Sequence, residues 1–247
     1  MRNLEKDIEQ IIISEVAALD RSDLYRTPLV AFSAANDEKY SDLKKIIGEW
    51  HLNPNELLPD AKSLISYFVP FTKEVVAGPK TAKYSSSIWE EAYLIVNKYF
   101  DHINEAISRY LTNHGFFVKT IKATHTYDPK DMQSMWSHRS AAAIANLGDF
   151  GINRMLITEK GCGGRFCTVI TSAPLTAGRE KFENKCLYIK NGSCGLCLKA
   201  CPIDALTTNS FDKFACQTEL KRNNEKGDFG ADTCGKCISV CPVAYIE

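Results

Sequence analysis

The sequence has neither an excess of charge of one sign nor a long apolar run, and both absences narrow its class. Thirty Lys and Arg residues balance thirty Asp and Glu residues, so the formal net charge is zero. A general nucleic-acid-binding protein carries a basic excess, so we expect no nucleic-acid partner. No stretch approaches the roughly twenty apolar residues of a membrane span, and residues 1–14 mix charges around a short apolar run, unlike a secretory signal. We therefore expect a cytoplasmic protein without a membrane partner.

Nucleotide-binding motifs are also absent. No Gly-x-Gly-x-x-Gly follows an expected strand, and there is no phosphate-binding loop. These absences leave a dinucleotide-binding fold unsupported. At 45% hydrophobic residues over 247 positions, the chain can still bury a full core and form two domains.

Cysteine, in contrast, is abundant, with ten residues. Six of them stand in two copies of Cys-Gly-x-Cys-x-x-x-Cys-Pro, namely SCGLCLKACPIDAL (193–206) and TCGKCISVCPVAYI (233–246). This spacing is typical of proteins with two 4Fe–4S clusters, which transfer electrons one at a time. Many thiols without an export signal indicate a reducing cytoplasm, and solvent-accessible clusters favour an anaerobic setting.

A crossing rule divides the cysteines into two sets. In two-cluster ferredoxins, the cysteine before proline ligates the cluster of the other motif. Each set then lacks one thiolate, because position 191, where the usual first ligand would stand, is Asn191. Cys186 is the nearest cysteine upstream, and Cys216 is the one cysteine between the motifs. The predicted first set is Cys186, Cys194, Cys197 and Cys241, and the predicted second set is Cys201, Cys216, Cys234 and Cys237.

Two other uses of these cysteines are less consistent with the pattern. Paired Cys-x-x-Cys motifs also make structural zinc sites, but zinc does not explain two Cys-Pro corners and two further thiols. Disulfides suit small secreted scaffolds. Cys162 and Cys167 remain outside both sets, and we expect small buried side chains there rather than ligands.

Hydrophobic periodicity predicts alternating helices and strands upstream of the motifs. The expected helices are 4–19, 40–50, 85–115 and 138–148. The expected strands are 28–35, 63–71, 116–124, 154–158 and 166–171, with a loop at 72–80 and a glycine-rich turn joining the last two strands. The fold class is therefore α+β, with an α/β cofactor- or substrate-binding domain at 1–176 and a ferredoxin-like domain at 177–247.

Two segments hold candidates for chemistry. Residues 124–139 gather polar side chains before the helix at 138–148, and Asp128, Asp131 and His138 are the candidate proton donors, with His125 and Tyr127 nearby. Within that helix, the alanines at 141–143 and 145 leave either space for a flat cofactor or room for close packing. The candidate cofactor-binding residues are Gly148, Gly151 and Arg165.

The segments around 57–247 resemble the epoxyqueuosine reductase and reductive dehalogenase group of iron–sulfur proteins. The resemblance is carried by Leu147-Gly148-x-x-Gly151, by Thr171-x-x-Pro174-Leu175, and by the double cysteine motif with an isolated cysteine between its copies. It implies a nitroreductase-like N-terminal domain that holds a corrinoid (cobalamin-type) cofactor over the clusters. The chain lacks the C-terminal helical-repeat region of epoxyqueuosine reductases, so we do not expect transfer RNA as its substrate.

The expected function is a 4Fe–4S-dependent reductase in which electrons pass through both clusters to a corrinoid. Two alternatives stay open, namely an electron carrier that reduces or reactivates a partner corrinoid protein, and a flavin-dependent reductase. A low-potential donor such as ferredoxin or flavodoxin is the expected redox partner.

Overall fold

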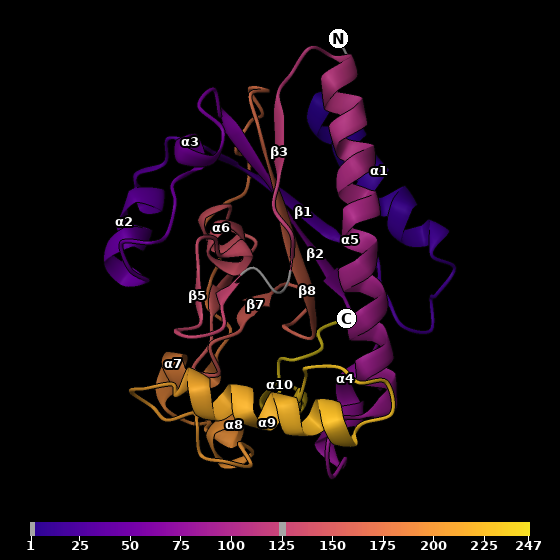
Figure 1. Cartoon of the computed structure of the whole chain (residues 1–247), viewed down its shortest axis with the longest axis vertical. Coiled ribbons are helices and arrows are strands. Elements are labelled where there is room, and N and C mark those ends of the chain that lie inside the picture. The colour runs from indigo at the N-terminus through magenta and orange to yellow at the C-terminus, as the bar shows by residue number, and fades with distance from the viewer. Residues whose placement is uncertain (1–2, 124–126) are drawn as a thin grey trace.

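A four-stranded antiparallel sheet organises the first two thirds of the chain in the computed structural model, which describes residues 3–123 and 127–247 (Figure 1). The strands lie in the order β1 (Leu29–Ala34), β2 (Ser63–Pro70), β8 (Gly164–Thr171) and β3 (Val118–Thr120). All eight residues of β2 are buried. Burial on both faces of a strand requires cover on both sides of the sheet, and helices supply it.

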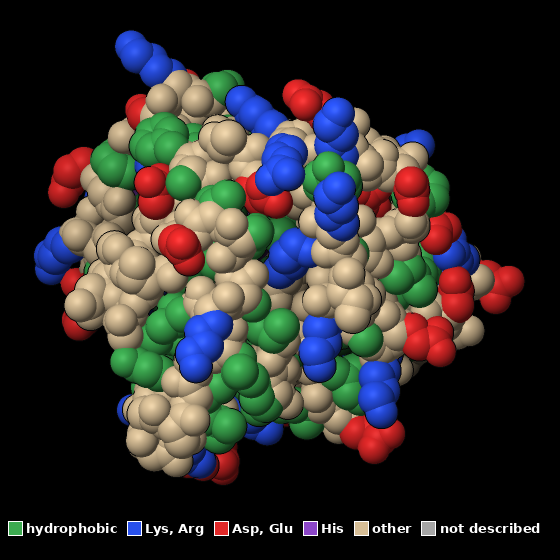
Figure 2. All heavy atoms as spheres, turned by 90° about the horizontal axis from the view of Figure 1, so that it is seen from below, with side chains coloured by type: hydrophobic (Ala, Val, Ile, Leu, Met, Phe, Trp, Pro, Cys, Tyr) green, Lys and Arg blue, Asp and Glu red, His purple; other side chains and the backbone are tan. Residues whose placement is uncertain are grey.

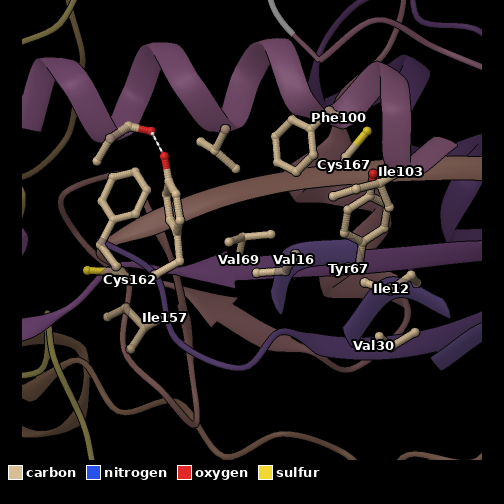
Figure 3. Packing of buried hydrophobic residues seen from close by; sticks show 14 of the residues in the cluster. Ile12, Val16, Val30, Tyr67, Val69, Phe100, Ile103, Ile157, Cys162 and Cys167 are labelled. Carbon is tan, nitrogen blue, oxygen red and sulfur yellow. Dashed lines mark hydrogen bonds between the residues drawn. The ribbon is translucent and has the colours of Figure 1, made fainter. Parts of the chain in front are cut away.

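Helices α1 (Leu4–Ala18) and α5 (Ser87–Asn113) cover one face. Tyr67, on β2, and Phe100, on α5, meet edge to face with ring centroids 5.5 Å apart. Figure 3 shows these two rings with Ile103 and Cys167 in the same cluster. The expected helix 85–115 is thus confirmed, and its buried side chains recur every three to four residues, as an amphipathic helix requires.

Helices α2 (Glu38–Ile46), α3 (Pro54–Leu57) and α6 (His138–Ile144) lie on the opposite side of the sheet. The Ser137 hydroxyl caps α6 by accepting from the Ser140 amide. Ala141 and Ala142 are fully buried, because small side chains let this helix approach the sheet closely. Helix α6 stops at Ile144, four residues before the expected end.

Two short hairpins complete this part, β4 (Tyr127–Asp128) with β5 (Gln133–Ser134) and β6 (Gly148–Phe150) with β7 (Leu156–Thr158). The expected strands at 154–158 and 166–171 exist, but they do not pair with each other. β7 pairs with β6, whereas β8 pairs with β2. The glycine-rich turn therefore carries the chain from one sheet to another.

Two other expectations were wrong in detail. The expected loop 72–80 contains α4 (Lys73–Ala77) and the 3-10 helix η1 (Gly78–Lys80), and the Thr72 hydroxyl accepts from the Val75 amide to start α4. The expected strand 116–124 pairs only over Val118–Thr120. As a result, β3 covers Val169–Thr171 and leaves the edge of β8 at Gly164–Thr168 without a strand partner among the described residues.

The C-terminal part lies below the sheet and contains α7 (Leu187–Asn191), α8 (Leu196–Lys199), α9 (Lys213–Lys226) and α10 (Lys236–Ser239) (Figure 1). The last residues return to the N-terminal part, where the amides of Cys162 and Gly163 donate to the Ala244 carbonyl at 3.0 Å. The fold is thus mixed, with helices and an antiparallel sheet. Among the helices described, none combines the length and apolarity of a membrane span.

Candidate iron–sulfur sites and the edge of strand β8

Each cysteine motif folds as one turn of helix between two cysteine-bearing loops. A glycine precedes the turn in both copies, at Gly195 before α8 and at Gly235 before α10. The Cys-Pro pairs follow directly after the turns. Helices α8 and α10 pack beside each other, which brings the cysteines of the two copies together.

The four residues of the first set line one small cavity. Cys186 at the start of α7 meets the cysteines of both motifs there, and Tyr188 and Val243 complete the wall. Burial raises the pKa of Cys197 to about 11, and thiolate charges on the other three members raise it further. The structure therefore brings together all four members of the first set.

The second set gathers around Cys216, which helix α9 carries. Burial raises the pKa of Cys216 to about 11, with added repulsion from Cys234 and Cys201. Burial likewise raises the pKa of Cys237 to about 12, and Cys234 and Cys216 add to this effect. Crowded buried thiols ionise only when a cation neutralises them, and iron does so. The donor chemistry of both sets thus fits 4Fe–4S clusters.

The arrangement differs from that of a single-ion site. Within residues 3–123 and 127–247, no three His, Cys, Asp or Glu side chains are placed to hold one metal ion. A cubane needs its four thiolates at four separate iron atoms.

Cys162 and Cys167 lie in different surroundings. Cys167 is buried between β8 and α5, where the Asn104 amide nitrogen donates to its sulfur at 3.4 Å. Cys162 is also buried, as expected, but it lies beside Cys241 of the first set. A hydrogen bond from the Cys162 thiol lowers the pKa of Cys241 to about 7. The sequence did not indicate this contact, because the two residues are far apart in the chain.

The candidate acids Asp128 and Asp131 belong to the β4–β5 hairpin. The Asp128 carboxylate accepts from the Lys130 amide at 2.8 Å, and Asp131 accepts from the Gln133 amide at 3.0 Å. Asp128 is exposed, whereas Asp131 is half-buried. His125 lies outside the described residues. The hairpin also reaches the C-terminal part, because Gln217 Nε2 on α9 donates to the Tyr127 hydroxyl at 2.9 Å.

His138 is held at both ring nitrogens. Its Nδ1 lies 2.7 Å from Thr168 Oγ1 and its Nε2 lies 3.2 Å from the Lys122 carbonyl. A carbonyl only accepts, so Nε2 carries the proton and Nδ1 accepts from the threonine hydroxyl. Burial lowers the pKa of His138 to about 4, and the charge of Arg165 lowers it further. His138 is therefore neutral near pH 7, and a neutral imidazole is a poor proton donor.

The candidate cofactor-binding glycines are packed against strand β7. A Cβ on Gly148 would lie 2.4 Å from the Ile157 carbonyl oxygen, and one on Gly151 would lie 2.8 Å from the Ile157 side chain. Gly148 thus needs glycine because it abuts the backbone of β7, whereas the atoms near Gly151 are ends of side chains that can move. Arg165 lies elsewhere, on β8, where its Nε donates to Asn97 Oδ1 at 3.0 Å and its guanidinium lies over the Tyr93 ring.

Arg139, which the sequence did not single out as a site residue, lies near Arg165. Arg139 is exposed, yet desolvation by surrounding protein, with a smaller contribution from Arg165, lowers its pKa to about 10. A thiolate at Cys237 acts in the opposite direction. Arg139 therefore connects the uncovered edge of β8 with the second cysteine set. We call Asn97, Arg139 and Arg165 the β8 edge site.

Comparison with known proteins gives a fold relationship. No protein-family model matches the chain, and no curated protein sequence matches it. The same fold occurs in an epoxyqueuosine reductase solved with a modified tRNA stem loop (TM-score 0.59, 20% identity, covering 98% of this chain and 66% of the reductase). It also occurs in a catabolic reductive dehalogenase bound to 3-bromo-4-hydroxybenzoic acid (0.63, 15%, 87% and 30%). A reductive dehalogenase structure described in terms of B12-dependent dehalogenation gives similar values (0.62, 14%, 87% and 29%).

These comparisons confirm the predicted resemblance at the level of fold. The chain spans 66% of the length of the epoxyqueuosine reductase and less than a third of the dehalogenases. The comparisons therefore show the fold that the chain shares with these reductases.

Proposed function

We propose that this protein is an iron–sulfur-dependent reductase in which two 4Fe–4S clusters relay single electrons to a corrinoid at the edge of β8. The observation that carries the proposal is the grouping of eight cysteines into two four-membered sets, each with the donor chemistry that a cluster requires. A corrinoid would supply a metal centre that accepts single electrons and reacts with substrate. A corrinoid is supported as the acceptor by the fold that the chain shares with a reductive dehalogenase described in terms of B12-dependent dehalogenation, and the β8 edge is our proposed place for it.

The surroundings of the two sets suggest an order of transfer. Cys237 of the second set lies close enough to Arg139 to influence its pKa, so this set faces the β8 edge. The first set lies beside exposed hydrophobic residues of α7 and α8, where Ile189 is 53% and Leu196 48% exposed. We infer that a donor protein reduces the first cluster and that the second cluster passes the electron to the acceptor.

Residues of the chain have distinct parts in this scheme. The eight cysteines hold the clusters, and Arg139 with Arg165 would keep the acceptor region positively charged. His138, neutral and fixed by Thr168, would position α6 at that edge. Asp128 and Asp131 stay candidate proton donors from the β4–β5 hairpin.

Partner docking belongs to the same proposal. Figure 2 shows the face seen from below Figure 1, where basic side chains cross the middle next to hydrophobic ones. An acidic, low-potential donor such as ferredoxin or flavodoxin matches this combination of charge and apolar surface. The exposed hydrophobic residues also favour a second candidate function, an electron carrier that reduces a partner corrinoid protein instead of its own cofactor.

Electron paramagnetic resonance of cob(II)alamin separates these two functions. The spectrum is recorded with and without protein whose clusters have been reconstituted anaerobically. A cobalt signal with a lost or replaced lower ligand is expected for the reductase. An unchanged cobalt signal beside clusters that dithionite reduces would refute corrinoid binding and favour the carrier.

The ligand sets have their own test. Cys216→Ser is expected to remove or alter the second cluster and spare the first, so that iron falls from about eight to about four atoms per chain. The matched variant Cys186→Ser should do the same to the first cluster. Iron content and a reduced spectrum like those of the parent would refute the assignment of the altered cysteine.

A further inference from the structure

The β8 edge site presents several hydrogen-bond donors that have no acceptor. Arg165 uses its Nε to reach Asn97, and among the described residues its two Nη atoms bond to nothing. The Nδ2 atom of Asn97 is buried without a partner. Unsatisfied buried donors are rare in native proteins and ask for an explanation. The Asn97 amide is such a donor, and the Arg165 Nη atoms beside it, which solvent reaches, require the same kind of partner, an acceptor.

The two guanidinium groups are held in place by neutral contacts. Arg165 stacks over Tyr93, with its central carbon 4.8 Å from the ring centroid. Arg139 donates through Nη1 to the Arg154 carbonyl at 2.8 Å and approaches Met155 Sδ at 3.4 Å. These contacts fix orientation but leave both positive charges uncompensated.

No acid compensates them either. In the described part of the chain, other arginines such as Arg21 and Arg179 pair with carboxylates, but Arg139 and Arg165 pair with none. Arg165 acts on Arg139 as a neighbouring cation, whereas a thiolate at Cys237 acts on it as a neighbouring anion. His138, the other titratable group facing them, is neutral. Arg139 is exposed and Arg165 is half-buried, so an anion from solvent can reach both guanidinium groups, and no carboxylate of the described residues pairs with either.

We propose that Arg139, Arg165 and Asn97 bind the anionic group of the substrate, a carboxylate or a phosphate, next to the second cluster. A guanidinium pair with an amide donor matches the several acceptor oxygens of such groups. This inference rests on the proposed function, which places electron delivery beside Cys237. It adds the class of substrate, a small organic acid or phosphate ester held by its charge.

Calorimetric titration of the purified full chain with benzoate and with inorganic phosphate tests the anion site. The parent is expected to bind one equivalent of at least one of these anions. Arg139→Gln and Arg165→Gln should each weaken binding by roughly tenfold or more, since each removes a charge-assisted hydrogen bond. Asn97→Asp should abolish it, because the new carboxylate occupies the arginines. Arg109→Gln, at an exposed position on α5, should bind like the parent.

Two further measurements separate binding from folding and from corrinoid recognition. Arg165→Lys keeps the charge and should retain more affinity than Arg165→Gln, with equal melting temperatures. Cobalamin also carries an anion, its phosphodiester, which cobinamide lacks. Equal cobalamin affinity in parent and Gln variants supports the substrate role. Loss of affinity for cobalamin but not for cobinamide would assign the site to the corrinoid and overturn our proposal.

Two other results would overturn the proposed anion site. One is that neither anion shows saturable binding, and the other is that the parent and the Gln variants bind the anions with equal affinity. These titrations need neither turnover nor a bound corrinoid. A protein that binds anions but leaves the cob(II)alamin spectrum unchanged would therefore refute the corrinoid and keep the anion site.

Discussion

The two copies of the cysteine motif have the same spacing but different neighbours. Around Gly195 in the first copy, an added Cβ would meet nothing within 4 Å, whereas at Gly235 it would lie 2.7 Å from the Trp89 ring. Leu196 of the first copy is 48% exposed, while the corresponding Lys236 donates to the Ala82 and Tyr84 carbonyls of the N-terminal part. One copy thus faces solvent and the other is docked.

This difference teaches that the repeated motif specifies thiol positions but not function. Ligand spacing is a local property, so both copies gather their cysteines alike. Docking depends on the rest of the chain, here η1 and the Trp89 ring of α5, which contact the second copy. The open copy is then available to a donor protein, and the docked copy is close to the β8 edge.

Removal of iron should have the largest effect on local stability, and it tests directly whether docking stabilises the second copy. In residues 177–247 the buried non-cysteine hydrophobic residues are Ala205, Leu206, Ala231, Ile238 and Ala244, which form little core. Anaerobic chelation should therefore lower hydrogen-exchange protection of the first copy by about a thousandfold. The second copy should keep partial protection through its contacts with α5.

Hydrogen exchange followed by mass spectrometry measures the protection of both copies, with the β2 peptide as internal standard. The β2 strand should keep its protection, because its core needs no metal. Equal protection of both copies after chelation would contradict the idea that docking distinguishes them.

A glycine-to-alanine pair tests the docking contact itself. Gly235 has φ +76°, which disfavours other residues, and alanine there would also overlap Trp89 and Pro79. Gly235→Ala should lower the free energy of unfolding by about 2–4 kcal/mol. Gly195→Ala should lower it by less than about 1 kcal/mol, because the added methyl meets no atom.

Denaturant unfolding of the cluster-loaded proteins, followed by near-ultraviolet circular dichroism, compares the two variants. Equal losses of stability would mean that the two copies are equally constrained and would remove the basis for the comparison.

Local patterns in the sequence were sufficient to predict how the cysteines group and where most helices and strands lie. Spacing alone predicted six of the eight cysteines that the structure groups into two sets, and Cys186 and Cys216 followed from counting. Periodicity located α1, α5 and β2, whose burial repeats are long. The partners of β7 and β8 were not predictable, because a turn between two strands does not say whether they pair. Of the β8 edge site the sequence indicated only Arg165, since Asn97, Arg139 and Arg165 come from three elements and form no linear motif.

A buried hydrogen bond across the docked interface should have an intermediate effect. Trp89 Nε1 donates to Thr233 Oγ1 at 2.7 Å, and both side chains are buried. Thr233→Val leaves the indole donor unpaired at a cost of about 1–3 kcal/mol in unfolding free energy. The double variant with Trp89→Phe should lose less than the sum of the single variants, because no unpaired donor remains. Strict additivity in this cycle would argue against the bond.

The smallest effect on stability is expected at the open copy, where the effect on function should be clear. Leu196→Glu changes a half-exposed side chain beside the first set, so its unfolding free energy should stay within about 0.5 kcal/mol of the parent. Reduction by an acidic flavodoxin should slow severalfold, since the variant adds negative charge and removes apolar contact where the donor is proposed to dock.

Ile46→Glu, at a 76% exposed position on α2, is the matched control. Stopped-flow bleaching of the clusters measures both rates. If the two variants are reduced equally fast, the donor docks elsewhere, and the open copy loses its proposed role in electron uptake.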